Sequence, residues 1–149
     1  MRALFLGMIY RTESYATISS LSNVGLESAS DKFQKNFLEG LENNKVEFDI
    51  ISSISIGSYP KNYGKLFIKG YYFKNRPKNS YREIGFINFY LIKGISRFLN
   101  TLFPFYKWTN NIEKHDEGIV FIYGLYLPNL FLMFLMKKIR PLNISIHYY

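Results

Sequence analysis

Hydrophobic and polar positions alternate along the chain in blocks that predict strands and helices in turn. Arg2 to Ile9 form a nearly continuous apolar run, which is typical of a central strand covered on both faces. The stretch from Tyr10 to Asn23 is rich in Ser, Thr, Tyr and Asn, and it predicts a loop at the carboxyl end of that strand. Functional loops of open α/β sheets lie at this end.

An amphipathic helix is predicted next, because apolar residues recur every four positions. The residues of this stripe are Ala29, Phe33, Phe37 and Leu41. Ser28 and Asp31 have the spacing of a capping box, which predicts Ser28 as the helix cap. Asn43 and Asn44 predict the helix end, and Val46 to Ser52 predict a second strand. These elements make one strand–helix–strand unit.

The middle of the chain is punctuated by glycine and proline before the alternation resumes. Residues 53–80 fit either short strands or a helix, and Glu83 to Phe89 predict a strand. A helix then follows, with Lys93 and Arg97 on the face opposite its apolar residues, and Pro104 bends or ends it. The apolar residues of this helix are Leu91, Ile92, Ile95, Phe98, Leu99, Leu102 and Phe103.

The last third of the chain predicts two more strands around one helix. Gly118 to Tyr123 have a buried-strand pattern, and Leu127 to Ile139 predict a helix that is apolar all round in its middle. Such a helix fits either a core position or a membrane interface. Apolar and polar residues alternate from Leu142 to His147, which predicts a final strand that runs to the chain end. Strands alternating with helices predict an α/β fold, a Rossmann-like three-layer sandwich with a mostly parallel sheet. We expect residues 1–149 to form a single domain whose sheet is incomplete at its C-terminal end, because nothing follows to cover the last strand.

Composition narrows the chemistry. The absence of cysteine excludes a disulfide framework, thiolate catalysis and sulfur-based zinc sites, and with only two histidines we expect no metal site. The start of the chain does not have the pattern of a secretory signal, and the most apolar window, Leu125 to Met136, is shorter than the roughly 20 residues that span a bilayer. We therefore expect a cytoplasmic protein.

The whole chain has a formal net charge of +8, and its positive charge is concentrated in one segment. Between Ile50 and Asn111 the only acid is Glu83, and the cations are Lys61, Lys65, Lys69, Lys74, Arg76, Lys78, Arg82, Lys93, Arg97 and Lys107. Phosphates on a lipid carrier, an anionic membrane surface or nucleic acid would suit such a segment, and a solvated basic loop would explain it equally well. Charge alone leaves these four alternatives open.

Common cofactor and hydrolase motifs are missing. Gly7 is followed by Met-Ile-Tyr, so no G-x-G-x-x-G follows the first strand, and the chain contains neither a P-loop nor a G-x-S-x-G elbow. We expect no cofactor. A flavodoxin-like protein is a further alternative, although the first loop lacks an obvious flavin phosphate site.

Two segments carry a resemblance to a known family. The stretch Asn-Val-Gly-Leu-Glu-Ser-Ala-Ser-Asp-Lys-Phe-Gln-Lys-Asn-Phe-Leu-Glu-Gly-Leu at 23–41 resembles the first loop and helix of family-4-type glycosyltransferases with the GT-B fold, and Ile-Val-Phe-Ile-Tyr-Gly-Leu-Tyr-Leu-Pro at 119–128 resembles their fourth strand and helix. The resemblance implies that this chain is the N-terminal, acceptor-side domain of a bacterial enzyme of surface polysaccharide synthesis. The nucleotide-sugar domain is then absent from the chain, and we expect no sugar transfer by this chain alone.

The resemblance also suggests site residues. The loop before the first helix approaches the donor diphosphate or the acceptor in such enzymes, which favours Gly25, Ser28, Ser30 and Lys32, because helix N-termini attract anions. The alternative is that Ser28 caps the helix, Lys32 is solvated and Gly25 forms a turn.

Four further residues are candidates for contact with the acceptor. Tyr123 and Tyr126 flank Gly124 after a strand, where they either stack on a sugar or pack in the core. Lys93 and Arg97 are candidates for contact with the acceptor or the membrane.

A last candidate is His147, near the carboxyl end of the final strand, which we assign to acceptor contact or proton transfer. His115 is expected at the opposite end of the sheet, exposed to solvent.

The leading hypothesis is therefore part of a glycosyltransferase that uses a nucleotide-sugar and a glycan or lipid-diphosphate acceptor at the inner face of the cell membrane. Its donor half would come from the missing domain or from a separate chain. The alternative is a nonenzymatic basic module that binds anionic membrane or RNA through residues 57–107, and nucleic acid is the less favoured of these ligands.

Overall fold

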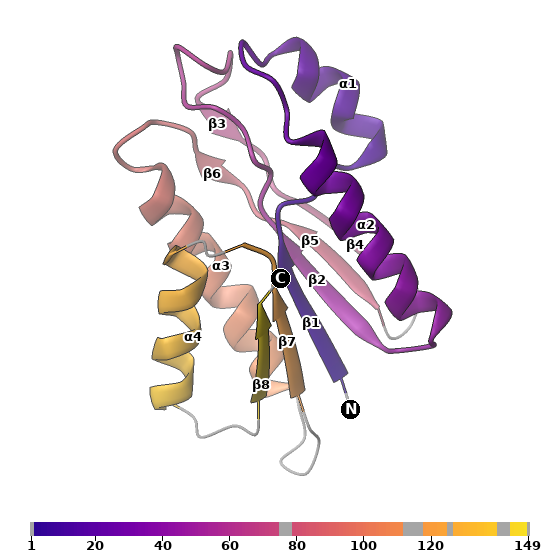
Figure 1. Ribbon diagram of the computed structural model, residues 1–149. Coiled ribbons are helices and arrows are strands. Elements are labelled where there is room, and N and C mark those ends of the chain that lie inside the picture. The colour runs from indigo at the N-terminus through magenta and orange to yellow at the C-terminus, as the bar shows by residue number, and fades with distance from the viewer. Residues whose placement is uncertain (1, 75–78, 112–117, 125–126, 140–143, 149) are drawn as a thin grey trace.

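The structure, a computed structural model, describes residues 2–74, 79–111, 118–124, 127–139 and 144–148. Strands and helices alternate along most of the chain (Figure 1). The elements are β1 (Arg2–Gly7), α1 (Thr12–Ser20), α2 (Ser28–Asn43), β2 (Phe48–Ser52), β3 (Phe67–Ile68), β4 (Tyr71–Lys74), β5 (Ser80–Glu83), β6 (Phe86–Ile87), α3 (Lys93–Asn110), β7 (Gly118–Ile122), α4 (Leu127–Ile139) and β8 (Ile144–Tyr148).

A six-stranded sheet in the order β4-β5-β2-β1-β7-β8 forms the centre of the fold. Neighbouring strands from β5 to β8 are parallel, and β4 runs antiparallel to β5 at one edge. The α/β prediction with a mostly parallel sheet is therefore confirmed. The first strand and the strand at 118–123 lie side by side as expected, with Arg2 opposite Gly118 and Leu6 opposite Ile122.

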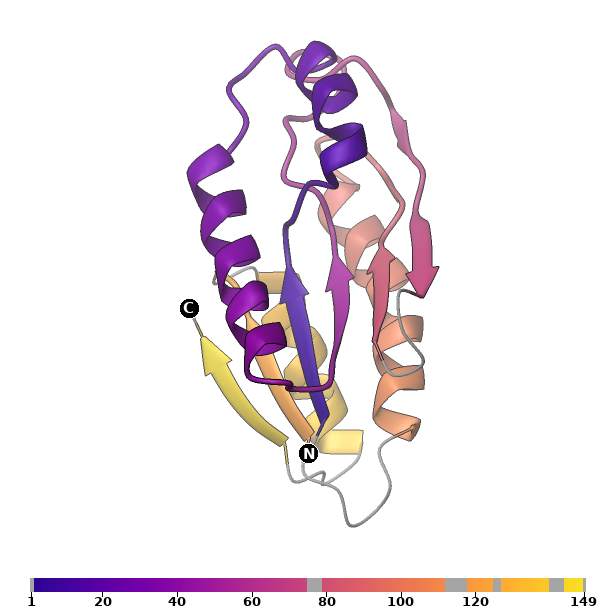
Figure 2. The same cartoon turned by 90° about the vertical axis from the view of Figure 1, so that its right-hand side faces the viewer.

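Helices flank both faces of this sheet because successive strand residues point to opposite sides. Leu4 and Leu6 of β1 belong to a buried core with Phe105 of α3 and Leu132 of α4. On the other face, the ring of Phe5 lies 5.7 Å from that of Phe37 in α2. Figure 2 shows α2 in front of the sheet, with α3 and α4 behind it.

A second, smaller core lies beyond the carboxyl ends of β1 and β2. It contains Tyr10, Ile18 of α1, Ile54, Tyr63 and Phe86. In Figure 1 this region, with α1 and the β3–β6 pair, forms the upper part of the molecule. The loop predicted at 10–23 is therefore wrong in part, because α1 forms there and buries Ile18 in this core.

The other sequence predictions of local structure need three corrections. Ser28 does not cap α2, because the N-cap is Glu27 without a side-chain cap hydrogen bond, and Ser28 is the first helical residue. The strand predicted at 83–89 divides into the end of β5 and the separate strand β6, which pairs with β3. Pro104 does not end α3, which continues to Asn110 and keeps Pro104 buried.

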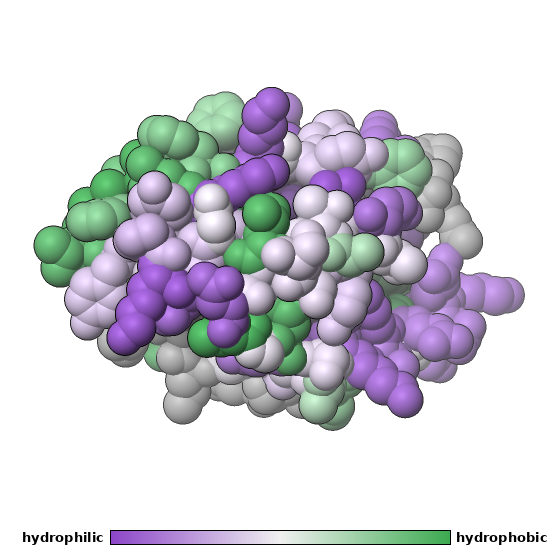
Figure 3. All heavy atoms as spheres, turned by 90° about the horizontal axis from the view of Figure 1, so that it is seen from above, coloured by the Kyte–Doolittle hydropathy of each residue, from purple (hydrophilic) through white to green (hydrophobic). Residues whose placement is uncertain are grey.

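The buried face of α3 also differs from the prediction. Arg97, Thr101, Phe105 and Trp108 form its buried side, whereas Phe98 and Leu102 are only partly buried. The exposed large hydrophobic residues between 91 and 134 in the described part of the chain are Leu91, Ile92, Ile95, Leu99, Phe103, Tyr106, Phe131 and Phe134. Hydrophobic surface gathers at the left of Figure 3, the side on which α3 and α4 lie. The described helices include none that is long and apolar enough to cross a membrane.

Candidate functional site

The carboxyl ends of β1, β2 and β7 meet at one edge of the sheet, where the strand order reverses beside β1. The backbone N–H of Ser53 donates to the carbonyl of Gly7 at 3.0 Å, and the N–H of Tyr123 donates to the carbonyl of Leu6 at 3.0 Å. These bonds continue the pairing beyond the strands. Open α/β sheets bind their ligands at such an edge, at the point where the order reverses.

Two buried polar side chains of α2 hold the segment that follows β1. Gln34 is fully buried, and its Oε1 accepts the backbone N–H of Met8 at 2.8 Å. Asp31 Oδ1 accepts the N–H of Tyr10 at 2.8 Å, and Asp31 Oδ2 lies 2.7 Å from Nζ of Lys35. The backbone N–H groups of Met8 and Tyr10 are therefore satisfied by the protein itself.

The predicted loop residues lie at the start of α2, at the same edge. Gly25, Ser28 and Lys32 are exposed, and Ser30 is half-buried, with its Oγ accepting a hydrogen bond from Gln34 Nε2 at 3.3 Å. Apart from its two chain neighbours, no described residue lies within 4 Å of the position of a Cβ on Gly25, so close packing does not require glycine there. Three of the four residues are thus accessible to a ligand at the helix N-terminus.

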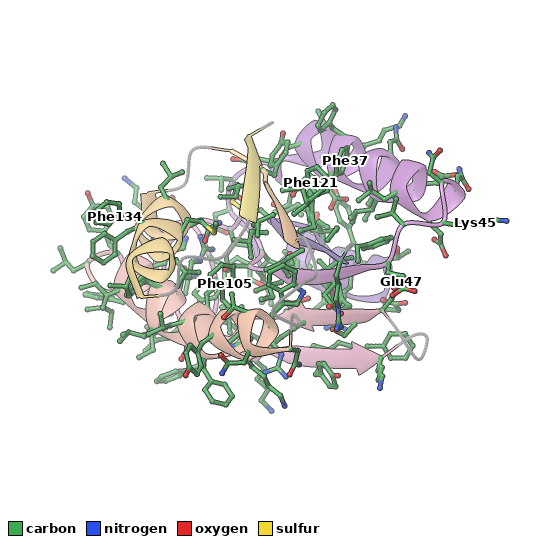
Figure 4. The ribbon with its side chains drawn as sticks, turned by 90° about the horizontal axis from the view of Figure 1, so that it is seen from below. Phe37, Lys45, Glu47, Phe105, Phe121 and Phe134 are labelled. Carbon is green, nitrogen blue, oxygen red and sulfur yellow. The ribbon has the colours of Figure 1, made fainter. Side chains whose placement is uncertain are left out.

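The structure brings Tyr123 beside this helix. The ring of Tyr123 lies 5.8 Å from that of Phe33, which is 50% exposed. Phe37 and Phe121 make a second ring contact of 5.2 Å deeper in the same interface (Figure 4). The end of β7 and the start of α2 therefore share an aromatic surface, which the spacing of the sequence does not reveal.

Lys93 and Arg97 lie on the other face of the sheet, apart from the α2 loop. Arg97 is 6% exposed; its Nη2 donates to the carbonyl of Ile54, and its Cζ lies 4.2 Å from the ring centre of Phe86. Lys93 Nζ donates to the carbonyl of Ile56. Burial, with a smaller contribution from the charge of Arg97, lowers the pKa of Lys93 to about 8.

The hydroxyl of Tyr10 donates to the carbonyl of Ser55, which lies between the two carbonyls bound by Lys93 and Arg97. Burial raises the pKa of this hydroxyl. Three consecutive carbonyls after β2 are therefore held by donors from two different parts of the chain. Sequence reasoning missed Tyr10, Asp31 and Gln34, because nothing in their local pattern marks them as buried.

A very small cavity lies between these groups and the strand ends. Its volume is about 10 Å³, and it is lined in part by Gly7, Ser53, Arg97, Thr101 and Asn129. That volume suits about one water molecule. The buried Oγ of Ser53 has no hydrogen-bond partner among the described residues, and such a water would satisfy it. At this edge of the sheet, a larger ligand would have to bind on the surface around α2 and Tyr123.

Glu83, the single acid of the basic segment, is buried and does not neutralise the surface. Its Oε2 lies 3.0 Å from Nε of Arg11 and accepts the hydroxyl of Tyr81 at 3.3 Å. Burial raises the pKa of Tyr81, and the neighbouring charge of Glu83 adds to this. Glu83 therefore does not act as a counterion for the exposed cations of this segment.

Three predicted residues lie wholly or partly outside the described part of the chain. Tyr126 and His115 lie outside the described residues. The backbone of His147 belongs to β8, opposite Phe121 and near the carboxyl end of the strand, whereas its side chain lies outside the described part. Within the described residues, no group of three or more His, Asp or Glu side chains is placed to hold a metal ion.

Comparisons with known proteins give no relative: the chain matches no protein-family model, no curated protein and no solved structure.

Proposed function

We propose that the chain is the acceptor-side, Rossmann-like half of a GT-B-type glycosyltransferase, which transfers a sugar from a nucleotide-sugar to a glycan or lipid-linked acceptor in surface polysaccharide synthesis. The observation that carries the proposal is the reversal of strand order between β1 and its neighbours β2 and β7. This arrangement is consistent with a three-layer sandwich that opens a crevice at its carboxyl edge.

The surface at this edge has the chemistry that an acceptor requires. Lys32 and Ser28 are exposed near the N-terminus of α2, where the helix dipole favours a phosphate. Tyr123 and the half-exposed Phe33 supply rings on which a sugar packs. Donor binding and the transfer step belong, on this proposal, to a second Rossmann-like domain.

Acceptor binding by the purified chain tests the proposal directly. We expect a short-chain lipid-diphosphate-linked sugar to bind saturably in calorimetry, and Tyr123→Ala and Lys32→Gln each to weaken that binding about tenfold. Asn36→Ala, an exposed change on the same helix, is the matched control. Sugar transfer from a nucleotide-sugar by the chain alone would contradict the division of labour, and absence of acceptor binding would overturn the assignment.

A second candidate function, binding to an anionic membrane surface, is favoured by the apolar face of α3 and α4. Ile95, Leu99 and Phe103 lie on one row of α3 and are 62%, 56% and 68% exposed. The ring of Phe98 lies 5.5 Å from that of Phe131, which joins this row to the exposed rings of α4. Phe134 projects away from the rest of the protein (Figure 4). Exposed apolar surface of this extent marks an interaction site.

The charge of α3 and α4 favours an anionic bilayer as the binding partner of this face. The sequences of α3 and α4 contain no acid, and Lys107 lies one turn beyond Phe103 on the same row. An apolar row ending in lysine places rings and aliphatic groups in the acyl boundary and the ammonium among phosphates.

Vesicle sedimentation tests this second candidate. We expect the chain to bind phosphatidylserine-containing vesicles more strongly than phosphatidylcholine vesicles, and the double variant Leu99→Ser, Phe103→Ser to lose most of that binding. Phe67→Ser removes an equally exposed ring from β3 and should bind as wild type does. Equal binding by all variants, or salt-sensitive binding to RNA instead of vesicles, would contradict a membrane-docking role for this face.

A further inference from the structure

A groove at the amino ends of the central strands gathers cations that lie far apart in the sequence. It has a volume of about 260 Å³, and its walls come from β1, β2, β4, β5 and the end of α3. The cations that line it are Arg2, Lys74, Arg82 and Lys107. We propose that this groove binds a small molecule that carries a phosphate or diphosphate group.

The charge in the groove is unbalanced even though an acid lies within it. Asp49 is the one acid among the lining residues, and its carboxylate accepts Nη2 of Arg2 at 2.7 Å and the N–H and hydroxyl of Ser80 at 2.9 and 2.6 Å. Asp49 and Arg2 therefore neutralise each other. Lys74, Arg82 and Lys107 have no acidic partner within the described part of the chain.

Trp108 forms part of the wall of the groove. The side chain lines the groove and is 5% exposed, yet its buried Nε1–H has no hydrogen-bond acceptor among the described residues. A buried donor without an acceptor destabilises a fold.

The number of cations selects the kind of anion. Three cations from three elements converge, so a monoanion leaves most of their charge uncompensated, whereas a phosphate dianion or a diphosphate balances it. Arg82 adds a planar fork of N–H donors that matches phosphate oxygens. Its guanidinium already lies 4.8 Å from the ring centre of Tyr72 and is thereby oriented.

The rest of the lining limits the size and character of the ligand. Leu4, Pro104 and the ring of Tyr72 supply apolar walls beside the cations. Sites for drug-sized molecules have volumes of about 300–1,000 Å³, so the groove suits a small phosphorylated compound. It lies at the opposite end of the strands from the edge assigned to sugar transfer, and the inference does not depend on that assignment.

The only tryptophan in the chain lies in this groove, so intrinsic fluorescence reports on it directly. Inorganic pyrophosphate is the probe, titrated against sodium chloride of equal ionic strength, with calorimetry as a second measurement. We expect a saturable change in emission for the wild-type chain. The double variant Lys74→Gln, Arg82→Gln should bind pyrophosphate at least about tenfold more weakly, because it removes two charged donors.

Lys61→Gln is the matched control, because Lys61 is an exposed cation that does not line the groove. We expect it to bind pyrophosphate as wild type does. A response that follows ionic strength alone, or that is lost in Lys61→Gln and kept in the groove variant, would overturn the proposal. Loss of pyrophosphate binding leaves the acceptor test at Tyr123 unaffected, so the two proposals fail separately.

The source of the phosphate is distinguished by competition. If pyrophosphate releases the wild-type chain but not the groove variant from vesicles containing phosphatidic acid, the ligand in the groove is a lipid headgroup. If pyrophosphate binds in the groove without releasing the chain from the vesicles, the ligand in the groove is a soluble phosphate compound. Both results support a phosphate site.

Discussion

Gly7 ends β1 at a point where a side chain has no room. A Cβ at this position would lie 2.2 Å from Cε1 of Phe5 and 2.6 Å from Oε1 of Gln34, the atom that accepts the N–H of Met8. We expect Gly7→Ala to lower the free energy of unfolding by about 1–3 kcal/mol, measured by urea denaturation, because the ring and the carboxamide must both move.

Gly40→Ala is the matched control for Gly7→Ala. Nothing lies within 4 Å of a Cβ at Gly40 in α2, so alanine should raise the free energy of unfolding by about 0.5–1 kcal/mol. If both substitutions change the free energy of unfolding in the same direction, Gln34 does not pack against Gly7 as closely as described.

Lys93 gives the protein a pH dependence of known sign. Its pKa is lowered from 10.5 to about 8 in the folded chain, chiefly by burial. Between these values the unfolded chain binds the additional proton, so the free energy of unfolding rises with pH. We expect wild type to gain stability relative to Lys93→Met as the pH rises through this window. Tyrosines whose pKa is raised contribute equally to both proteins and cancel in the difference.

Urea denaturation of both proteins at pH values on either side of the Lys93 pKa measures this effect. Lys61→Met, which changes an exposed cation, should show a difference from wild type that stays constant with pH. A constant difference for Lys93→Met as well would mean that the ammonium is not buried against Arg97.

At the scale of elements, α2 is held to the sheet by polar groups at one end and by aromatic rings further along. Asp31→Ala removes the acceptor of the Tyr10 N–H, a buried bond. We expect a loss of about 1–3 kcal/mol in the free energy of unfolding, because the donor is left without a partner. Asn36→Ala, on the exposed side of the same helix, should change stability by less than about 0.5 kcal/mol. Equal effects would show that Asp31 does not anchor the helix.

The strands were predictable from the sequence because buried strands have continuous apolar runs. The runs at Arg2 to Ile9 and Gly118 to Tyr123 correspond to β1 and β7, and their parallel pairing followed from the intervening helices. The helix at Leu91 to Phe103 was also found, but its buried face was not. Periodicity shows that a helix has an apolar stripe, and it does not show whether another element covers that stripe.

Arg97 and Lys93 show more clearly what a sequence pattern does not reveal about burial. A cation is expected to face solvent, yet here the carbonyls of Ile54 and Ile56, about forty residues earlier, accept their N–H groups. Only the three-dimensional fold brings those carbonyls to α3. The candidate loop at Gly25 to Lys32 was placed at the carboxyl edge by general rules of α/β folds, whereas its proximity to Tyr123 through Phe33 depends on side-chain packing.

At the scale of the whole molecule, the excess of positive charge is a cost to the folded state. Ion pairs between described residues join Arg2 to Asp49, Arg11 to Glu83 and Lys35 to Asp31. The buried Glu83 is occupied by Arg11, so the cations of the segment 50–111 repel one another with little compensation. A net charge far from zero favours solubility and destabilises the compact state.

Added salt should therefore stabilise this protein. Raising sodium chloride from about 0.02 M to about 0.3 M shortens the screening length from about 20 Å to about 6 Å. We expect the Tm to rise by about 2–4 °C, which corresponds to about 1 kcal/mol for a chain of this size. Lys61, Lys65 and Lys69 are exposed, so changing all three to glutamine should raise the Tm in low salt and reduce its dependence on salt. A Tm that falls with salt would show instead that attractive ion pairs dominate the surface, and that the cations of the groove and of the 61–69 segment are compensated within the fold.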